Sequence, residues 1–135
     1  TPFIQDKTKG AFVLCLTSNN SSKDFQFMTE DNLSLYQLVA DKTKSLNDND
    51  NLGIVVGATN ETQMSSLRDN TANLSWLIPG IGAQGGDLET SIKVGNKNGI
   101  GIVNISRSII YAGSGSINDI SESALNYTKQ IRSYL

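Results

Sequence analysis

Four short runs of apolar residues recur along the chain, and each of them ends in small or polar residues. The runs cover residues 11–16, 53–57, 76–79 and 100–105. None of them alternates apolar with polar positions, as a strand with one exposed face does. Continuous runs of this length are typical of parallel strands that are buried on both faces. The pattern therefore predicts four such strands, with Phe12 and Trp76 in the core and Cys15 as a buried, inert thiol.

The stretches between these runs carry apolar residues at helical spacing. The last stretch has the clearest apolar stripe, and Asp87 is expected to cap an earlier helix that ends at Gly95. Strands and helices then alternate, which implies right-handed crossovers and a parallel sheet. The expected helices cover residues 35–46, the neighbourhood of Met64 and Leu67, residues 87–95 and residues 117–135.

The spacing of these units indicates the kind of α/β fold. The last three units repeat at about 24 residues, close to the minimum for a strand and its helix, which favours a (β/α)8 barrel over a doubly wound sheet. A barrel needs about 250 residues, so residues 1–135 are expected to supply about its last four βα units, as one incomplete domain. Its two strand edges need a cover. We expect the missing half on the same polypeptide or on another chain.

Composition narrows the classes of function. A net charge of -2 and a pI near 4.9 give no basic surplus for a nucleic-acid groove. The absence of histidine removes the imidazole base, the commonest zinc ligand and the Ser-His-Asp triad. One cysteine excludes an internal disulfide, and no apolar run approaches the ~20 residues of a membrane span. We expect a cytoplasmic globular piece of a longer chain that binds neither nucleic acid nor membrane.

A glycine-rich segment, residues 79–87, lies between the third strand and a helix. Glycines let the backbone approach a ligand, and exposed N–H groups with a helix N-terminus attract an anion. Gly80, Gly82 and Gly85 also match the dinucleotide-binding fingerprint. However, the next strand ends without the carboxylate that would hold a ribose. An anion cradle and a tight turn without a ligand both remain open.

Two further strand ends carry candidate chemistry. Arg107 follows the last strand, where barrels often bind phosphate, and its planar charged fork suits phosphate oxygens. Because Arg107 is expected to lie beside the glycine cradle of the preceding strand, phosphate binding by Arg107 is favoured over a salt bridge at the rim. Residues 17–20 follow the first strand with hydroxyl and amide groups that suit a polar heterocycle or an ordinary turn.

Four segments together resemble the orotidine 5'-monophosphate (OMP) decarboxylases, specifically the C-terminal half of the bacterial-type subfamily. The most specific is Pro-Gly-Ile-Gly-Ala-Gln-Gly-Gly-Asp at 79–87. The others, at residues 12–19, 53–59 and 103–112, occur in the family's order over nearly the whole chain. The resemblance implies a (β/α)8 barrel, normally a homodimer, that converts OMP to UMP in pyrimidine synthesis without a metal or cofactor.

The resemblance also implies ligand contacts by position. It assigns Ser18, with Thr17 beside it, to the amide edge of the pyrimidine, and Pro79 and Ile81 to the base pocket. Gln84 is assigned to the base or phosphate region. Arg107 and the backbone N–H of Ser106 are assigned to the phosphate. The phosphate cradle then consists of Gly80, Gly82, Gly85 and Arg107. The family often has glycine at the position of Ser106.

One departure from the family pattern concerns catalysis. The family's Asp-x-Lys-x-x-Asp motif, whose lysine protonates the carbanion left by loss of CO2, is absent from this sequence. The resemblance therefore implies the half that binds phosphate and base, inactive alone. Two alternatives stay open: another phosphate-binding barrel enzyme, such as a sugar-phosphate decarboxylase, or a non-catalytic nucleotide-binding half-barrel. Residues 20–32 are expected to form a surface loop or a mobile lid.

Overall fold

The computed structural model describes residues 2–135. Four of its strands form one sheet, and two short strands form a separate hairpin. In chain order the elements are β1 (Ala11–Leu16), the 3-10 helix η1 (Asn20–Asp24), β2 (Thr29–Glu30), β3 (Leu33–Ser34), α1 (Leu35–Ser45), β4 (Leu52–Val56), α2 (Glu61–Asn70), β5 (Ser75–Pro79), α3 (Leu88–Gly95), β6 (Gly101–Asn104), α4 (Arg107–Ile110) and α5 (Ile117–Tyr134).

The main sheet is parallel throughout, in the order β1-β4-β5-β6. Strands that follow one another in the sequence are therefore neighbours in space, and at least one helix lies between each pair. This is the expected succession of βα units, and each predicted strand agrees with the observed one to within one residue at either end. The register between β1 and β4 shifts between Leu14 and Leu16, which lets both Cys15 and Leu16 turn into the core.

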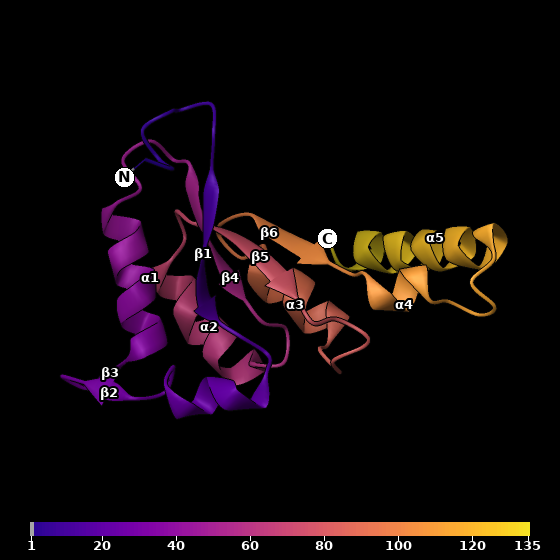
Figure 1. Cartoon of the computed structure of the whole chain (residues 1–135), viewed down its shortest axis with the longest axis horizontal. Helices are drawn as coiled ribbons and strands as arrows, with labels where there is room; N and C mark the ends of the chain where they lie inside the picture. Colours follow the sequence, from indigo (N-terminus) through magenta and orange to yellow (C-terminus); the bar gives the residue numbers. More distant parts are fainter. Residues whose placement is uncertain (1) are drawn as a thin grey trace.

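The core lies between one face of this sheet and helices α1, α2 and α3 (Figure 1). Ile54, Trp76 and Ile78 are fully buried on the sheet side, and Met64 and Ile92 meet them from the helices. Each apolar side chain removed from water in this way contributes about 1.5–3 kcal/mol. The prediction that Trp76 is a core residue is confirmed.

The opposite face of the sheet is apolar and open. Phe12 is 43% exposed, Leu14 63% and Ile102 45%, so the prediction that the strands are buried on both faces is wrong for this chain, as is the placement of Phe12 in the core. The error has a physical reason. A strand whose second face fills the interior of a closed barrel shows the same continuous apolar run as one covered by helices on both faces. In this chain, whose main sheet has four strands, that second face stays uncovered.

The C-terminal part of the chain extends beyond the β6 edge of the sheet, where α5 lies alongside α4 (Figure 1). The predicted amphipathic helix is confirmed, and its Tyr127, Ile131 and Tyr134 pack against the core from the side. Its outer residues stay exposed, with Ile117 at 85%. Among the helices of residues 2–135, none is both long and apolar enough to cross a membrane.

Residues 20–34 form ordered structure between β1 and α1. The 3-10 helix η1 is followed by the β2/β3 hairpin, whose two turn residues, Asp31 and Asn32, both have positive φ (49° and 65°). Such a turn matches the twist of a two-stranded hairpin. The segment that was expected to form a surface loop or a mobile lid therefore contains a 3-10 helix and a hairpin, neither of which was predicted. The four-residue α4 was also missed.

Candidate functional site

The candidate site lies at the C-terminal edge of the parallel sheet. In a parallel sheet all strands point the same way, so the segments that follow β1, β4, β5 and β6 meet at one edge. This geometry brings together Thr17, Ser18, the segment 79–87 and Arg107, which are far apart in the sequence.

The glycine-rich segment forms a tight loop after β5. Gly80, Gly82 and Gly85 have φ values of +100°, +75° and +81°, a region that other residues rarely adopt. The loop closes on itself, because the N–H of Gly86 donates to the carbonyl of Gly80 at 3.1 Å. These glycines are therefore required by the backbone path.

Asp87 ends this loop and caps α3, as predicted. Its carboxylate accepts a hydrogen bond from the N–H of Thr90 at 2.7 Å, and this bond lowers the pKa of Asp87 below its usual value. The carboxylate is thus occupied at the start of the helix, where negative charge is favourable.

Arg107 and the glycine loop share one pocket of about 140 Å³. Arg107 is exposed, and no carboxylate within the part of the chain that the structure describes forms a salt bridge with it. Its charge is therefore available to a ligand. The pocket is lined by Pro79, Gly80, Ile81, Ala83, Gln84, Asn104, Ser106 and Arg107.

A second pocket, of about 210 Å³, adjoins the first, because Pro79 and Gln84 line both. One part of its wall is apolar, with Leu14 and Val55 from the open face of the sheet. The polar part comes from Thr17, Ser18 and Asn19 after β1 and from Gln84. The two pockets together offer a cationic end and a mixed apolar and polar end.

Ser18 has a buried hydroxyl without a hydrogen-bond partner among the described residues. It lies between two glycines: a Cβ at Gly80 would stand 2.8 Å from both Ser18 Oγ and Gln84 Oε1, and one at Gly57 would stand 2.7 Å from the Ser18 nitrogen. Both positions therefore need glycine for Ser18 to fit. An unpartnered buried hydroxyl costs about 1–3 kcal/mol, which a ligand with a matching polar group would recover.

Thr17 is held by residues that the sequence analysis did not identify. Its N–H donates to Gln26 Oε1, and its hydroxyl accepts from Gln26 Nε2, both at 2.9 Å. Asn60 Nδ2 donates to the Thr17 carbonyl at 3.1 Å. Gln26 is nine positions away and Asn60 forty-three, and nothing in the sequence around either residue indicates a contact with Thr17.

The described structure brings all seven predicted ligand contacts into these two pockets. Gly80 also lines the first pocket, while Gly82 and Gly85 shape the loop without lining either. Asn19, from the candidate segment 17–20, lines the second pocket. Sequence reasoning missed the pocket residues Leu14, Val55, Ala83 and Asn104. Most of these belong to the apolar strands or to the loops next to named residues, where their direction depends on the fold.

Comparison with known proteins identifies the family. The model of the Orotidine 5'-phosphate decarboxylase / HUMPS family matches residues 3–116. The chain belongs to this family. An orotidine 5'-phosphate decarboxylase of Dehalococcoides mccartyi (strain CBDB1) is 46% identical over 97% of the chain and 50% of its own length. One of Natronomonas pharaonis is 43% identical over 87% of the chain and 44% of its own length. The chain thus spans about half the length of the curated relatives it matches.

Solved structures of the family agree with the fold. The structure of Leishmania donovani UMP synthase superposes with a TM-score of 0.89 at 34% identity, covering 98% of this chain and 29% of that one. Leishmania donovani OMP decarboxylase gives a TM-score of 0.85 at 32% identity, covering 98% of this chain and 51% of that one. The prediction of a (β/α)8 barrel, of which this chain supplies four βα units, is therefore confirmed.

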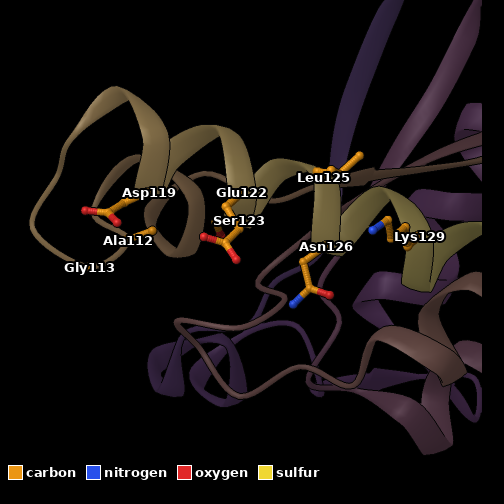
Figure 2. Close-up of a pocket in the computed structure, with 8 residues that line it drawn as sticks. All are labelled: Ala112, Gly113, Asp119, Glu122, Ser123, Leu125, Asn126 and Lys129. Carbon is orange, nitrogen blue, oxygen red and sulfur yellow. The ribbon is translucent and has the colours of Figure 1, made fainter.

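A larger concavity, of about 580 Å³, runs along α5 and the preceding loop in this member of the OMP decarboxylase family (Figure 2). Glu122, Asn126 and Lys129 project from successive turns of α5 into it. Asp119 at one end accepts hydrogen bonds from the N–H and hydroxyl of Ser114, at 2.9 and 2.6 Å, and these bonds lower the pKa of Asp119 to about 2. This groove contains none of the strand-end residues. We place the site at the smaller pair of pockets because glycines, cation and unpartnered hydroxyl converge there.

Proposed function

We propose that this chain is the substrate-binding half of an OMP decarboxylase, which converts OMP to UMP by loss of CO2. The observation that supports it is the adjoining pair of pockets, one with a free guanidinium and a glycine loop, the other with an unpartnered hydroxyl on an apolar wall. A nucleoside monophosphate has the same division into an anionic and a heterocyclic end.

In this proposal the first pocket binds the phosphate. Arg107 offers a planar pair of N–H donors to the phosphate oxygens, with the backbone N–H of Ser106 beside it. The glycine loop lets the ligand approach the main chain closely. Because this group lies away from the reacting carbon, its binding energy is available to lower the barrier there.

The second pocket binds the pyrimidine. Ser18 Oγ meets the amide edge of the base, and Pro79 lines the same pocket. Ile81, which the resemblance assigns to the base pocket, lines the first pocket instead. Gln84 belongs to both pockets, so its amide is placed to bridge base and phosphate. The ligand is thereby fixed at both ends, which orients the carboxylate-bearing carbon toward the rest of the barrel.

The chemical step needs residues that this sequence does not contain. Loss of CO2 leaves a carbanion that must be protonated, and the Asp-x-Lys-x-x-Asp motif that supplies the proton in the family is absent here. We propose that the remaining half of the barrel, on the same or another chain, carries that motif and covers the open face formed by Phe12, Leu14 and Ile102. The complete enzyme is proposed to be a cytoplasmic homodimer that uses no cofactor, and this chain alone should not decarboxylate OMP.

The test is UMP binding by the complete barrel, measured by calorimetry. Arg107→Ala should weaken UMP binding by about 10- to 100-fold, the value of a charge-assisted hydrogen bond to phosphate. Arg132→Ala is the matched control, because it removes the same charge from the exposed end of α5. Unchanged affinity in Arg107→Ala would contradict the phosphate assignment. Tighter binding of a pentose or hexulose phosphate than of UMP would favour a sugar-phosphate decarboxylase instead.

A further inference from the structure

Gln26 makes a two-point contact with the end of β1 although it belongs to the segment between η1 and the β2/β3 hairpin. Its amide oxygen accepts from the Thr17 N–H and its amide nitrogen donates to the Thr17 hydroxyl, each at 2.9 Å. Both bonds are partly buried. A reciprocal pair of this kind fixes direction as well as distance, because both ends of one planar amide are engaged.

Gln26 is itself held on both sides by backbone hydrogen bonds. Its N–H donates to the Ser22 carbonyl at 2.8 Å, and its carbonyl accepts from the N–H of Tyr36, in the first turn of α1, at 3.1 Å. Ser22 and Tyr36 are both buried. The amide of Gln26 therefore projects from a fixed point between η1 and α1, and it can hold the end of β1 in one position.

The other side of Thr17 is fixed by Asn60, the residue before α2. Asn60 Nδ2 donates to the Thr17 carbonyl at 3.1 Å and to the Gly57 carbonyl at 3.4 Å. The Thr17 carbonyl belongs to the peptide unit that leads into Ser18. The N–H, the hydroxyl and the carbonyl of Thr17 are thus all engaged, whereas the next side chain, Ser18, has a buried hydroxyl with no partner among the described residues.

We infer that Gln26 is a positioning residue of the ligand pocket, which holds Thr17 so that the unpartnered Ser18 hydroxyl is presented to the heterocycle of the ligand. This inference rests on the proposed function. Thr17 then acts through its neighbour Ser18, because the Thr17 hydroxyl already pairs with Gln26. It also gives the segment 20–34 a role as the fixed support of the pocket.

The experiment measures UMP affinity and steady-state kinetics of the complete barrel in a double-mutant cycle of Gln26→Leu and Ser18→Ala. Gln26→Leu removes both bonds to Thr17 and should weaken UMP binding about tenfold, as Ser18→Ala should. If Gln26 acts through Ser18, the double variant should bind UMP no more weakly than Ser18→Ala alone. Gln26→Glu should restore most of the affinity, because a carboxylate accepts from both the N–H and the hydroxyl of Thr17.

Gln37→Leu is the matched control. Gln37 is a glutamine of the same region whose amide oxygen accepts from the Ser34 N–H at 2.8 Å and does not contact Thr17. Gln37→Leu should lower the melting temperature while leaving UMP affinity unchanged. If Gln26→Leu fails to fold, Thr17→Val removes one of the two bonds. Thr17→Val should then weaken UMP binding about threefold when Ser18 is present, and it should have no effect in the Ser18→Ala background.

Independent effects of Gln26→Leu and Ser18→Ala that multiply in the double variant would overturn the inference. So would a folded Gln26→Leu protein that binds UMP as the parent does while Ser18→Ala does not. If instead neither Ser18→Ala nor Arg107→Ala changed UMP affinity, the proposed function itself would be wrong. The two failures are therefore distinguishable.

Discussion

Arg68 is buried on α2 without a carboxylate partner in the described part of the chain, and its replacement tests how the loops opposite the ligand site are held. Its Nε donates to the carbonyl of Lys97 at 3.0 Å, and its Nη1 donates to those of Leu74 at 2.8 Å and Thr71 at 3.3 Å. Its Cζ lies 4.7 Å from the centroid of the Trp76 ring. One side chain thus joins the segments that lead into β5 and β6.

The size of the effect follows from what each replacement leaves behind. Arg68→Ala removes all three hydrogen bonds and the cation–π contact and opens a cavity, which should lower the free energy of unfolding by about 3–4 kcal/mol. Arg68→Met keeps much of the packing and removes a charge whose burial is unfavourable and lowers the pKa of Arg68, so its cost should be about 2 kcal/mol. Arg68→Lys keeps a buried charge without the fork and should be at least as harmful as Arg68→Ala.

The assay is urea unfolding followed by the fluorescence of Trp76, which is the single tryptophan of this chain and is fully buried. Arg132→Met, on the exposed surface of α5, is the control and should stay within about 0.5 kcal/mol of the parent. A lysine variant as stable as the methionine variant would refute the reasoning, because the three carbonyls would then not require the guanidinium geometry.

Two further predictions follow from single positions. Gly82→Ala should lower the free energy of unfolding by about 1–2 kcal/mol more than Gly85→Ala does, and it should also weaken UMP binding. Both have positive φ, but a Cβ at Gly82 would stand 2.9 Å from the Tyr127 hydroxyl, whereas at Gly85 nothing lies within 4 Å; equal melting curves would contradict this. Asp119 has its pKa lowered from 3.8 to about 2 by hydrogen bonds from Ser114 and Ser116. Its contribution to stability is therefore complete above the unfolded-state value and lost as the pH falls toward 2. The melting-temperature difference between the parent and Asp119→Asn should vanish over that interval, and a difference that persists at the acid end would count against these bonds.

The elements could be predicted from the sequence because each has a local signal. The apolar runs located the strands to within one residue, and Asp87 and Gly95 marked the limits of α3. Exposure could not be predicted in the same way. Leu14 and Ile54 belong to runs of the same kind, yet one is 63% exposed and the other 0%. Which face is covered depends on strands that this chain does not contain.

The site was predictable where topology alone decides it. Parallel strands deliver Ser18, the glycine loop and Arg107 to one edge whatever the details of packing. The hydrogen bonds of Gln26 and Asn60 to Thr17 depend instead on how a loop folds back over a strand end. Such contacts between residues without a motif have no periodicity, so sequence patterns carry no information about them.

The two pockets differ in how much of their wall this chain supplies. The proposed phosphate pocket is formed by residues of β5, β6 and the loops that follow them, so this chain provides its cation and its glycine turn together. The proposed base pocket includes Leu14 and Val55, which also belong to the open face of the sheet, and Leu14 is 63% exposed. Closure of the barrel over that face would therefore also complete the proposed base pocket. Under the proposed function, recognition of the phosphate is built into the half-barrel, whereas recognition of the base and the proton transfer beside it both depend on the other half.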